Sequence, residues 1–425
     1  MGEGAGAVEG MVTAGAGCRC RLCGAGLSRT FADLGVSPLA NSFVPEGAAD
    51  RMEPFYPLHA FVCTACWLVQ LREFETPSGI FSNYLYFSSF SESWLRHAER
   101  YAEAMKRRFA LGGGSFACEV ASNDGYLLQY LQAAGVRVLG VDPARNVAES
   151  AVAKGIPTEV AFFGAETATR LRAEHGPADL MTANNVLAHV PDIHDFAEGF
   201  HVLLGERGTA TFEFPHLLRL IRENQFDTIY HEHFSYLSFT VARRIFAAHG
   251  MRVYDAVELA THGGSLRLFV CHDGNATRPD TPRVAEMLER ERRAGLGEID
   301  TYRRFSEAVV ATKCDLLEFL VAAKREGKSV VGYGAPAKGN TLLNYCGVKT
   351  DLIEFTVDRS PHKAGKLLPG VRLPIRSPEA IFERRPDYVL ILPWNLKDEV
   401  MQQMAGIREW GGRFVTPIPR VQIHP

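Results

Sequence analysis

The chain has 425 residues, of which 46% are hydrophobic and 22% charged, and its formal net charge is −3. This composition excludes a largely disordered protein, and a charge so close to neutral shows no footprint of a general nucleic-acid binder. No run of 18 apolar residues occurs, so we expect neither a membrane partner nor a nucleic-acid partner. At roughly 150 residues per domain, the length predicts about three domains.

Residues 1–17 are rich in Gly and Ala and lack both a basic start and an apolar core. They predict a flexible tail and no secretory signal. The chain contains nine cysteines, an odd number, which argues against a framework of disulfide bonds. We therefore expect free thiols in a reducing compartment, the cytoplasm.

The first predicted unit, residues 18–80, is marked by its cysteines. Four of them form two CxxC pairs: Cys20 with Cys23, and Cys63 with Cys66. Two tight turns of this kind place four thiolates around one Zn²⁺ ion, with Cys18 or His59 as substitute ligands. Buried apolar thiols and a redox CxxC are the alternatives. Four thiolates leave no open coordination position, so such a zinc ion is structural.

Strands and helices alternate in the next unit, residues 81–280. Trp94, Ala98, Tyr101, Met105 and Phe109 recur at helical spacing. Further on, apolar strand-like segments cover 115–120, 136–144, 178–190 and 208–215, with a helix around 195–204. This alternation predicts a parallel sheet covered by helices on both faces.

The segment Glu119–Gly125 links the first of these strands to a helix, and Asp142 follows 23 residues after Glu119. An acidic residue at that distance is typical of ribose binding in nucleotide-binding sheets. Ala121 and Asn123 stand where tighter loops carry Gly, which favours a ligand with an adenosyl group and no pyrophosphate over a dinucleotide. An ordinary strand-to-helix crossover is the alternative. The polar residues Asn184, Asn185 and His189 end the third strand, at the edge where such sheets bind ligands.

The turn formed by Tyr230, His231, Glu232 and His233 carries four adjacent polar side chains. His suits proton transfer near neutral pH, a neighbouring Glu can stabilise the charged ring, and Tyr can donate to a developing oxyanion. A metal site shared by His231 and His233, and a polar loop without chemistry, are the alternatives.

Two further segments occupy the C-terminal third. Residues 281–319 predict a charged helical connector with a break near Gly295–Gly297, and 320–425 predict a second α/β unit. Its turn after the first strand contains Lys338 and Asn340, which together with backbone N–H groups suit a substrate diphosphate. A remnant turn without a ligand is equally compatible. Tyr84, near the junction of the first two units, is a candidate for a ligand site or for core packing.

The ordered set of motifs resembles one enzyme family. Two CxxC pairs are followed by EVASNDGYLL, NNVLAHV, FEFPHL, YHEHFSYLS, HGGSLR and GYGAPAKGN. Across residues 18–425 this set resembles the nucleotide-sugar C-methyltransferases of antibiotic deoxysugar biosynthesis, including those that methylate C3 of dTDP-4-keto-6-deoxy sugars. The resemblance implies an α/β protein with a small N-terminal zinc-binding domain, a central class I (Rossmann-like) methyltransferase domain and a C-terminal Rossmann-like domain that binds the nucleotide sugar.

The resemblance also implies roles for single residues. The zinc ligands fall on the four cysteines of the CxxC pairs. The S-adenosylmethionine site is expected to include Glu119, Ala121, Asn123, Gly125, Asp142, Asn184 and Asn185. His233 is the expected general base, with Tyr230, Glu232, His189 and Tyr84 as its catalytic partners. The sugar nucleotide is expected to meet Tyr84, Asn185, His189, Lys338 and Asn340.

Two other functions remain open from the sequence. An NAD-dependent nucleotide-sugar-modifying enzyme would use the C-terminal glycine turn, and a nonenzymatic zinc module would bind protein or nucleic acid. We expect a monomer or a weak homodimer. The sequence leaves open the identity of the sugar, C3 against C5 methylation and the stereochemical course.

Overall fold

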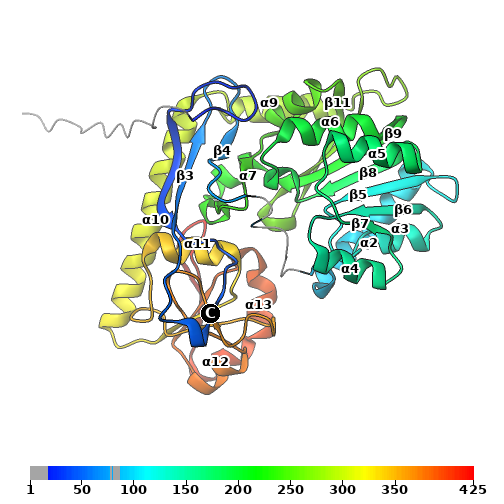
Figure 1. The fold of residues 1–425 in the computed structure, drawn as a ribbon. Coiled ribbons are helices and arrows are strands. Elements are labelled where there is room, and N and C mark those ends of the chain that lie inside the picture. Colours follow the sequence, from blue (N-terminus) through cyan, green and yellow to red (C-terminus); the bar gives the residue numbers. More distant parts are fainter. Residues whose placement is uncertain (1–17, 77–78, 80–86) are drawn as a thin grey trace, which may run out of the picture.

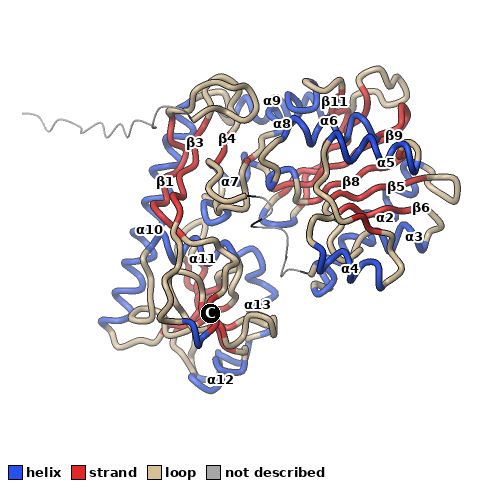
Figure 2. Tube along the Cα trace, in the orientation of Figure 1, coloured by secondary structure: helices blue, strands red, loops and turns tan. Residues whose placement is uncertain are grey.

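The computed structural model describes residues 18–76, 79 and 87–425, arranged around three main β-sheets. Figure 1 shows the small N-terminal sheet beside the long helix α10 (Ile299–Arg325), the C-terminal domain at one end of this pair, and the large central sheet beside them. Figure 2 shows the strands of the central sheet enclosed by helices. In the described part of the chain no helix is both long enough and apolar enough to span a membrane.

The N-terminal sheet combines segments from distant parts of the chain. Its antiparallel strands, in spatial order, are β1 (Arg29–Ser37), β3 (Tyr56–Val62), β4 (Val69–Leu71) and β10 (Ser235–Tyr236). So short a segment cannot build a core alone, and α10 supplies the missing surface: Phe31 stacks on Phe305 with ring centroids 4.4 Å apart.

The central sheet has seven strands. In spatial order they are β7 (Thr158–Glu159), β6 (Arg137–Val141), β5 (Phe116–Val120), β8 (Ala178–Asn184), β9 (Leu204–Pro215), β12 (Ser265–His272) and β11 (Met251–Leu259). The first five are parallel, but β12 is antiparallel to both neighbours. This is the class I methyltransferase topology. The parallel sheet expected from the alternation is confirmed for these five strands. At the edge, the short η5 connection (Thr261–Gly263) between β11 and β12 permits only an antiparallel pair.

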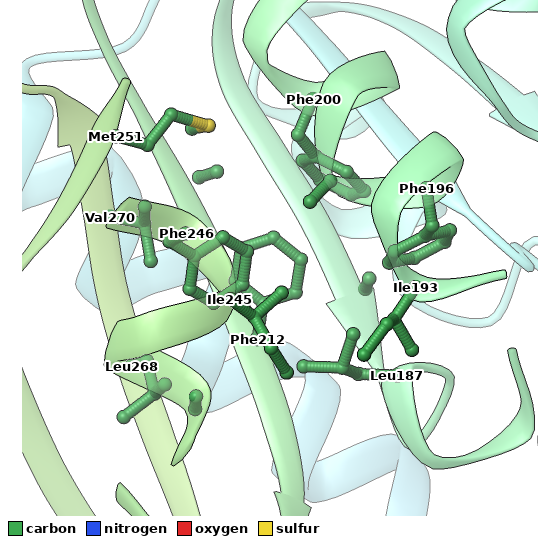
Figure 3. Close-up of a cluster of buried hydrophobic side chains, with 14 of the residues drawn as sticks. Leu187, Ile193, Phe196, Phe200, Phe212, Ile245, Phe246, Met251, Leu268 and Val270 are labelled. Carbon is green, nitrogen blue, oxygen red and sulfur yellow. The ribbon is translucent and has the colours of Figure 1, made fainter. Parts of the chain in front are cut away.

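Helices cover both faces of the central sheet, as the alternation predicted. One face is covered by α5 (Ala165–His175), α6 (Ile193–Leu203) and α8 (Phe239–Ala247), and the other by α2 (Glu92–Phe109), α3 (Leu128–Ala133) and α4 (Arg145–Ala153). Figure 3 shows the first core, where Phe212 of β9 lies between Phe200 and Phe246, with ring centroids 4.6 and 4.5 Å away. This packing makes the C-terminal strand ends a rigid platform for the site.

Two helices lead to the C-terminal domain. The connector forms α9 (Pro282–Arg293) and α10, interrupted at residues 294–298, so the expected break is confirmed. Because α10 continues to Arg325, it passes the boundary drawn at residue 319.

The C-terminal sheet has six strands. In spatial order they are β16 (Ile375–Arg376), β14 (Thr356–Val357), β13 (Val330–Tyr333), β17 (Tyr388–Ile391), β18 (Arg413–Thr416) and β19 (Gln422–His424). All pairs are parallel except β18 with β19. Its helices are α11 (Ala337–Cys346), α12 (Glu379–Arg384) and α13 (Lys397–Gln403). After α13 the chain continues into η7 (Ala405–Trp410), a separate 3₁₀ segment.

Small elements complete the fold. The short strands β2 (Val44–Pro45) and β15 (Lys366–Leu367) pair with each other and tie the N-terminal unit to the C-terminal domain. The remaining short helices are η1 (Glu46–Ala48), η2 (Ser88–Phe90), η3 (Leu187–His189), α7 (Leu217–Arg222), η4 (Phe226–Thr228) and η6 (Trp394–Leu396). Of these, η3 and η4 carry groups of the site described next.

Candidate active site

The loop between β5 and α3 has an unusual backbone. Ala121, Asn123 and Gly125 have φ values of 54°, 50° and 78°. Gly accepts this left-handed region freely, whereas it is costly for Ala, so the loop contains strain of the kind that binding sites store. A Cβ on Gly125 would lie 3.0 Å from the side chain of Ile156. Ala121 and Asn123 stand where tighter loops carry Gly, yet the backbone at both positions still has the left-handed conformation that Gly usually provides.

Asp142, directly after β6, ties this loop to the next one. One carboxylate oxygen accepts a hydrogen bond from the backbone N–H of Asn123 and the other accepts one from Ala144, both at 2.8 Å. Burial raises the pKa of Asp142 to about 6. The carboxylate therefore fixes the loop, and each oxygen still has a second lone pair for a ligand hydroxyl.

The strand ends around this loop suit a cationic, polar ligand. Glu119 is completely buried, and burial together with Asp142 and Asp124 raises its pKa well above the ordinary value. Among the described residues, Ser122 Oγ, Asp124 Oδ1 and Asn184 Nδ2 are buried without a hydrogen-bond partner. Unsatisfied buried polar groups mark a place where a ligand completes the bonding, and the ammonium, sulfonium and ribose groups of S-adenosylmethionine match these acceptors and donors.

A second group of polar side chains consists of His233 and its neighbours Tyr230 and His189. Its Nδ1 is 2.8 Å from the main-chain oxygen of Thr228, the last residue of η4, so Nδ1 carries the proton and donates it. The ring of Tyr230 lies 4.0 Å away and that of His189 4.6 Å away, centroid to centroid. With the proton on Nδ1, Nε2 is the basic nitrogen of the neutral ring.

His189, at the end of η3, comes from the loop after β8. Burial lowers its pKa to about 4, although a hydrogen bond to the main chain of Glu232 favours the charged form. His189 is therefore neutral at pH 7. Asn185 precedes η3 in a left-handed conformation, and its N–H donates to the Glu213 carbonyl at 2.7 Å.

The remaining residues of the turn face the N-terminal unit. Glu232 is 4% exposed, one of its oxygens accepts a hydrogen bond from Asn41 at 2.6 Å, and burial raises its pKa to about 7. His231 Nε2 lies 3.2 Å from the Pro57 carbonyl, and its ring packs edge-on against Tyr56. His231 and His233 thus have separate partners, and among the described residues the group of three or more candidate metal ligands is the four cysteines.

The C-terminal turn is engaged within the protein. Lys338 Nζ donates to Asn395 at 2.7 Å and lies 4.7 Å from the ring centroid of Trp394. Asn340 is completely buried in α11. The carboxylate of Asp358, after β14, accepts hydrogen bonds from Ala335 and Ser360, as Asp142 does in the central domain. Tyr84 lies outside the described residues.

The four cysteines of the CxxC pairs meet as the spacing predicted. The Sγ atoms of Cys20, Cys23, Cys63 and Cys66 lie within 4.8 Å of one another. Tetrahedral zinc with Zn–S bonds of about 2.3 Å requires Sγ–Sγ separations of about 3.8 Å, so the set fits the ion. The substitute ligand His59 instead lies 2.8 Å from Thr30.

Sequence reasoning missed two groups of the site. Asn41 lies 191 residues from Glu232 in the chain, and the Thr228 carbonyl belongs to the backbone. Neither has a local sequence pattern, although the position of Thr228 shortly before the YHEH turn is a weak signal.

Three protein families match successive parts of the chain. Residues 20–81 match a family described as a putative zinc binding domain, 94–256 match a methyltransferase domain, and 260–419 match a C-methyltransferase C-terminal domain. The first two agree with the cysteine cluster and the seven-stranded sheet.

Individual proteins are similar over different extents. The C-methyltransferase NovU of Streptomyces niveus is 38% identical over 404 residues, which cover 95% of this chain and 96% of that protein. Among solved structures, magnesium protoporphyrin IX methyltransferase of Synechocystis PCC 6803 with bound SAM is 15% identical over 42% of this chain and 79% of that one, with a TM-score of 0.32. A methyltransferase of Anabaena variabilis is 15% identical over 41% and 85%, with a TM-score of 0.35. Because it extends over almost the whole length of both proteins, the match to NovU is the one that identifies the family.

Proposed function

The chain belongs to the C-methyltransferase family that includes NovU of Streptomyces niveus, and from this premise we propose its substrate and mechanism. It is an S-adenosylmethionine-dependent C-methyltransferase with a structural zinc site. The proposed substrate is a dTDP-linked 4-keto-6-deoxy sugar of antibiotic biosynthesis, methylated at a carbon next to the C4 ketone, with C3 as the expected position. The observation that carries this proposal is the cluster of His233, Tyr230 and His189, in which His233 donates its Nδ1–H to the Thr228 carbonyl and Nε2 is the basic nitrogen of the ring.

The proposed cofactor site is the strained loop with its neighbouring strand ends. Glu119 and Asp124 provide buried carboxyl oxygens as acceptors for the ammonium group, and Asp142 provides an acceptor for the ribose hydroxyls. Asn184 ends β8, the strand that pairs with β5, and its Nδ2 is the proposed source of a further hydrogen bond to the cofactor. S-adenosylmethionine supplies there an electrophilic methyl group on a positively charged sulfur.

His233 is the proposed general base. A hydrogen on the carbon next to a ketone becomes acidic when the enolate oxygen is stabilised. Nε2 of His233 accepts that proton while the C–H electrons move into the enolate, and Nδ1 keeps its bond to Thr228 throughout. General-base catalysis of this kind increases the reaction rate by about 10²- to 10⁴-fold.

The enolate needs a hydrogen-bond donor on the same side of the sugar. Tyr230 lies against His233 and is the proposed donor, with Tyr84 as a further predicted one. His189 also lies against His233, but its single N–H would first have to release the main chain of Glu232. A donor aimed at a developing oxyanion is worth about 10²- to 10³-fold in rate. Asn185, Lys338 and Asn340 remain predicted sugar-nucleotide contacts; Lys338 would first have to release Asn395.

The function is tested by incubating the protein with S-adenosylmethionine labelled on the methyl carbon and a panel of dTDP-4-keto-6-deoxy sugars. We expect label on a sugar carbon, located by NMR of the product. Label on oxygen or nitrogen, or none with any keto sugar, would overturn the proposal. Calorimetric binding of S-adenosylhomocysteine and NAD separates it from the NAD-dependent alternative, which predicts tight NAD binding alone.

Cofactor affinity is expected to depend on pH through Asp142. The folded pKa of about 6 means that Asp142 is mostly protonated at pH 5, and the ribose hydroxyls donate best to the ionised form. S-adenosylhomocysteine should therefore bind about tenfold more weakly at pH 5 than at pH 8, since one pH unit below the pKa leaves about a tenth of the group ionised. Calorimetry at both pH values should show this change in the wild type and not in Asp142→Asn.

The control for this measurement is Asp179→Asn. Asp179 accepts a hydrogen bond from the Phe116 N–H at the opposite end of β5, away from the cofactor loop. This variant should keep the wild-type pH dependence. An unchanged pH dependence in Asp142→Asn would assign the titration to another group and remove Asp142 from the ribose role.

A further inference from the structure

The turn formed by residues 230–233, called the catalytic turn below, leads directly into a strand of the N-terminal sheet. Directly after it, Ser235 and Tyr236 form β10 and pair with Gln70 and Val69 of β4. The N–H of Leu71 also donates to the Phe234 carbonyl at 3.0 Å. The strand that follows His233 is therefore part of a sheet whose other strands all come from the first 71 residues.

One side chain of this unit reaches a candidate catalytic residue directly. Asn41 lies in the loop after β1, and its Nδ2 donates to Glu232 Oε1 at 2.6 Å. The loop is closed by a hydrogen bond from the Phe43 N–H to the Asn41 carbonyl at 3.0 Å. A carboxylate that is 4% exposed needs a donor in place of water, and a donor to an ionised acceptor is among the stronger hydrogen bonds.

Glu232 is connected in turn to both histidines. It precedes His233 in the chain, and its main chain accepts a hydrogen bond from His189. The rings of His189 and His233 meet edge to face at 4.6 Å. A displacement of Glu232 therefore moves the proposed base and His189 together.

We propose that Asn41 is a positioning residue which fixes the Glu232 carboxylate and thereby holds His189 and His233 in the geometry that deprotonation requires. The N-terminal unit then completes the active site as well as carrying the zinc site. This inference rests on the proposed function, because it assigns Asn41 to the base step of that reaction.

The test is Asn41→Ala in the full-length, zinc-loaded protein. Loss of a hydrogen bond to a charged group predicts a fall in kcat of roughly 10- to 100-fold. KM for the sugar nucleotide and affinity for S-adenosylhomocysteine should change less than threefold (about the size of RT), since the Asn41 side chain is bonded to Glu232 within the protein. Exchange of the sugar's α-hydrogen for deuterium, followed without cofactor turnover, should slow by the same factor as kcat.

The pH dependence of kcat distinguishes a positioning role of Asn41 from a general loosening of the surrounding loop. The Asn41 amide favours ionised Glu232, so its removal raises the pKa of that carboxyl above its wild-type value of about 7. The titratable groups around Glu232 are His231 and His233 in the turn and His189 on η3. Ionised Glu232, the chain neighbour of His233, favours the imidazolium that forms when His233 takes up the proton. In Asn41→Ala this carboxylate becomes protonated at a higher pH, so an acid limb of kcat that follows Glu232 should move upward by about one pH unit. Asn41→Asp, which adds a like charge, should move it further.

Ser42→Ala is the matched control, because Ser42 is the exposed neighbour in the same loop. It should retain wild-type kcat and pH profile, and all variants should keep one zinc and remain folded at the assay temperature. Wild-type kcat and acid limb in Asn41→Ala would overturn the inference while leaving the proposed function intact. A fall in kcat without a shift of the acid limb would reduce Asn41 to a structural role. Absence of exchange and methylation in the wild-type protein would instead refute the proposed function.

Discussion

Replacement of His233 by Asn is expected to lower kcat by about 10²- to 10⁴-fold, the range that general-base catalysis contributes. The amide group of Asn can still donate to the Thr228 carbonyl, as Nδ1 of His233 does at 2.8 Å. It offers no basic nitrogen in place of Nε2, so proton removal slows while the fold and cofactor site stay intact. Turnover of labelled S-adenosylmethionine and calorimetric affinity for S-adenosylhomocysteine measure the two effects separately.

The control for this substitution is His272→Asn. His272 ends β12, and its Nε2 hydrogen-bonds the Leu204 carbonyl, remote from the YHEH turn. This variant should keep wild-type turnover. Deuterium exchange at the α-carbon should stop in His233→Asn and persist in His272→Asn; exchange at the wild-type rate in His233→Asn would place the base elsewhere.

Local patterns in the sequence predicted what depends on local structure. Paired cysteines, the helical spacing of Trp94 to Phe109 and the acidic residue after β6 all correspond to features of the described structure. The cofactor loop was predicted as well, because the residues of Glu119–Gly125 indicate a sharp turn of the backbone between a strand and a helix. These features need only a few neighbouring residues to specify them.

Features that join distant segments were not predicted. Asn41 meets Glu232 across 191 residues, and β10 joins the N-terminal sheet by only two residues, too few for any strand periodicity. The role of Asp142 in bonding two backbone N–H groups was also hidden, although Asp358 repeats it in the C-terminal domain. A carboxylate that organises a loop and one that binds ribose have the same sequence signature.

Loss of zinc is expected to abolish methyl transfer without abolishing cofactor binding. Metal binding at four thiolates supplies on the order of 10 kcal/mol of folding free energy, and the short N-terminal segment has little core of its own to replace it. Cys66→Ser should therefore lose the ion and unfold the segment. Because β10 pairs with β4, and Asn41 holds Glu232, the catalytic turn should become disordered with it. Zinc content, kcat and calorimetric affinity for S-adenosylhomocysteine are the measurements.

The matched control is Cys314→Ser, an exposed cysteine on α10 outside the zinc cluster, which should retain zinc and activity. Hydrogen exchange gives a readout independent of turnover: in Cys66→Ser, peptides covering residues 230–236 should lose protection, while those covering β5 and the cofactor loop keep it. The cofactor loop is expected to survive because its supports, Asp142 and the central sheet, belong to the central domain. If 230–236 remained protected and kcat stayed at the wild-type level after zinc loss, the catalytic turn would be held by the central and C-terminal domains alone, through contacts such as the hydrogen bond from Thr341 to the Ile229 carbonyl.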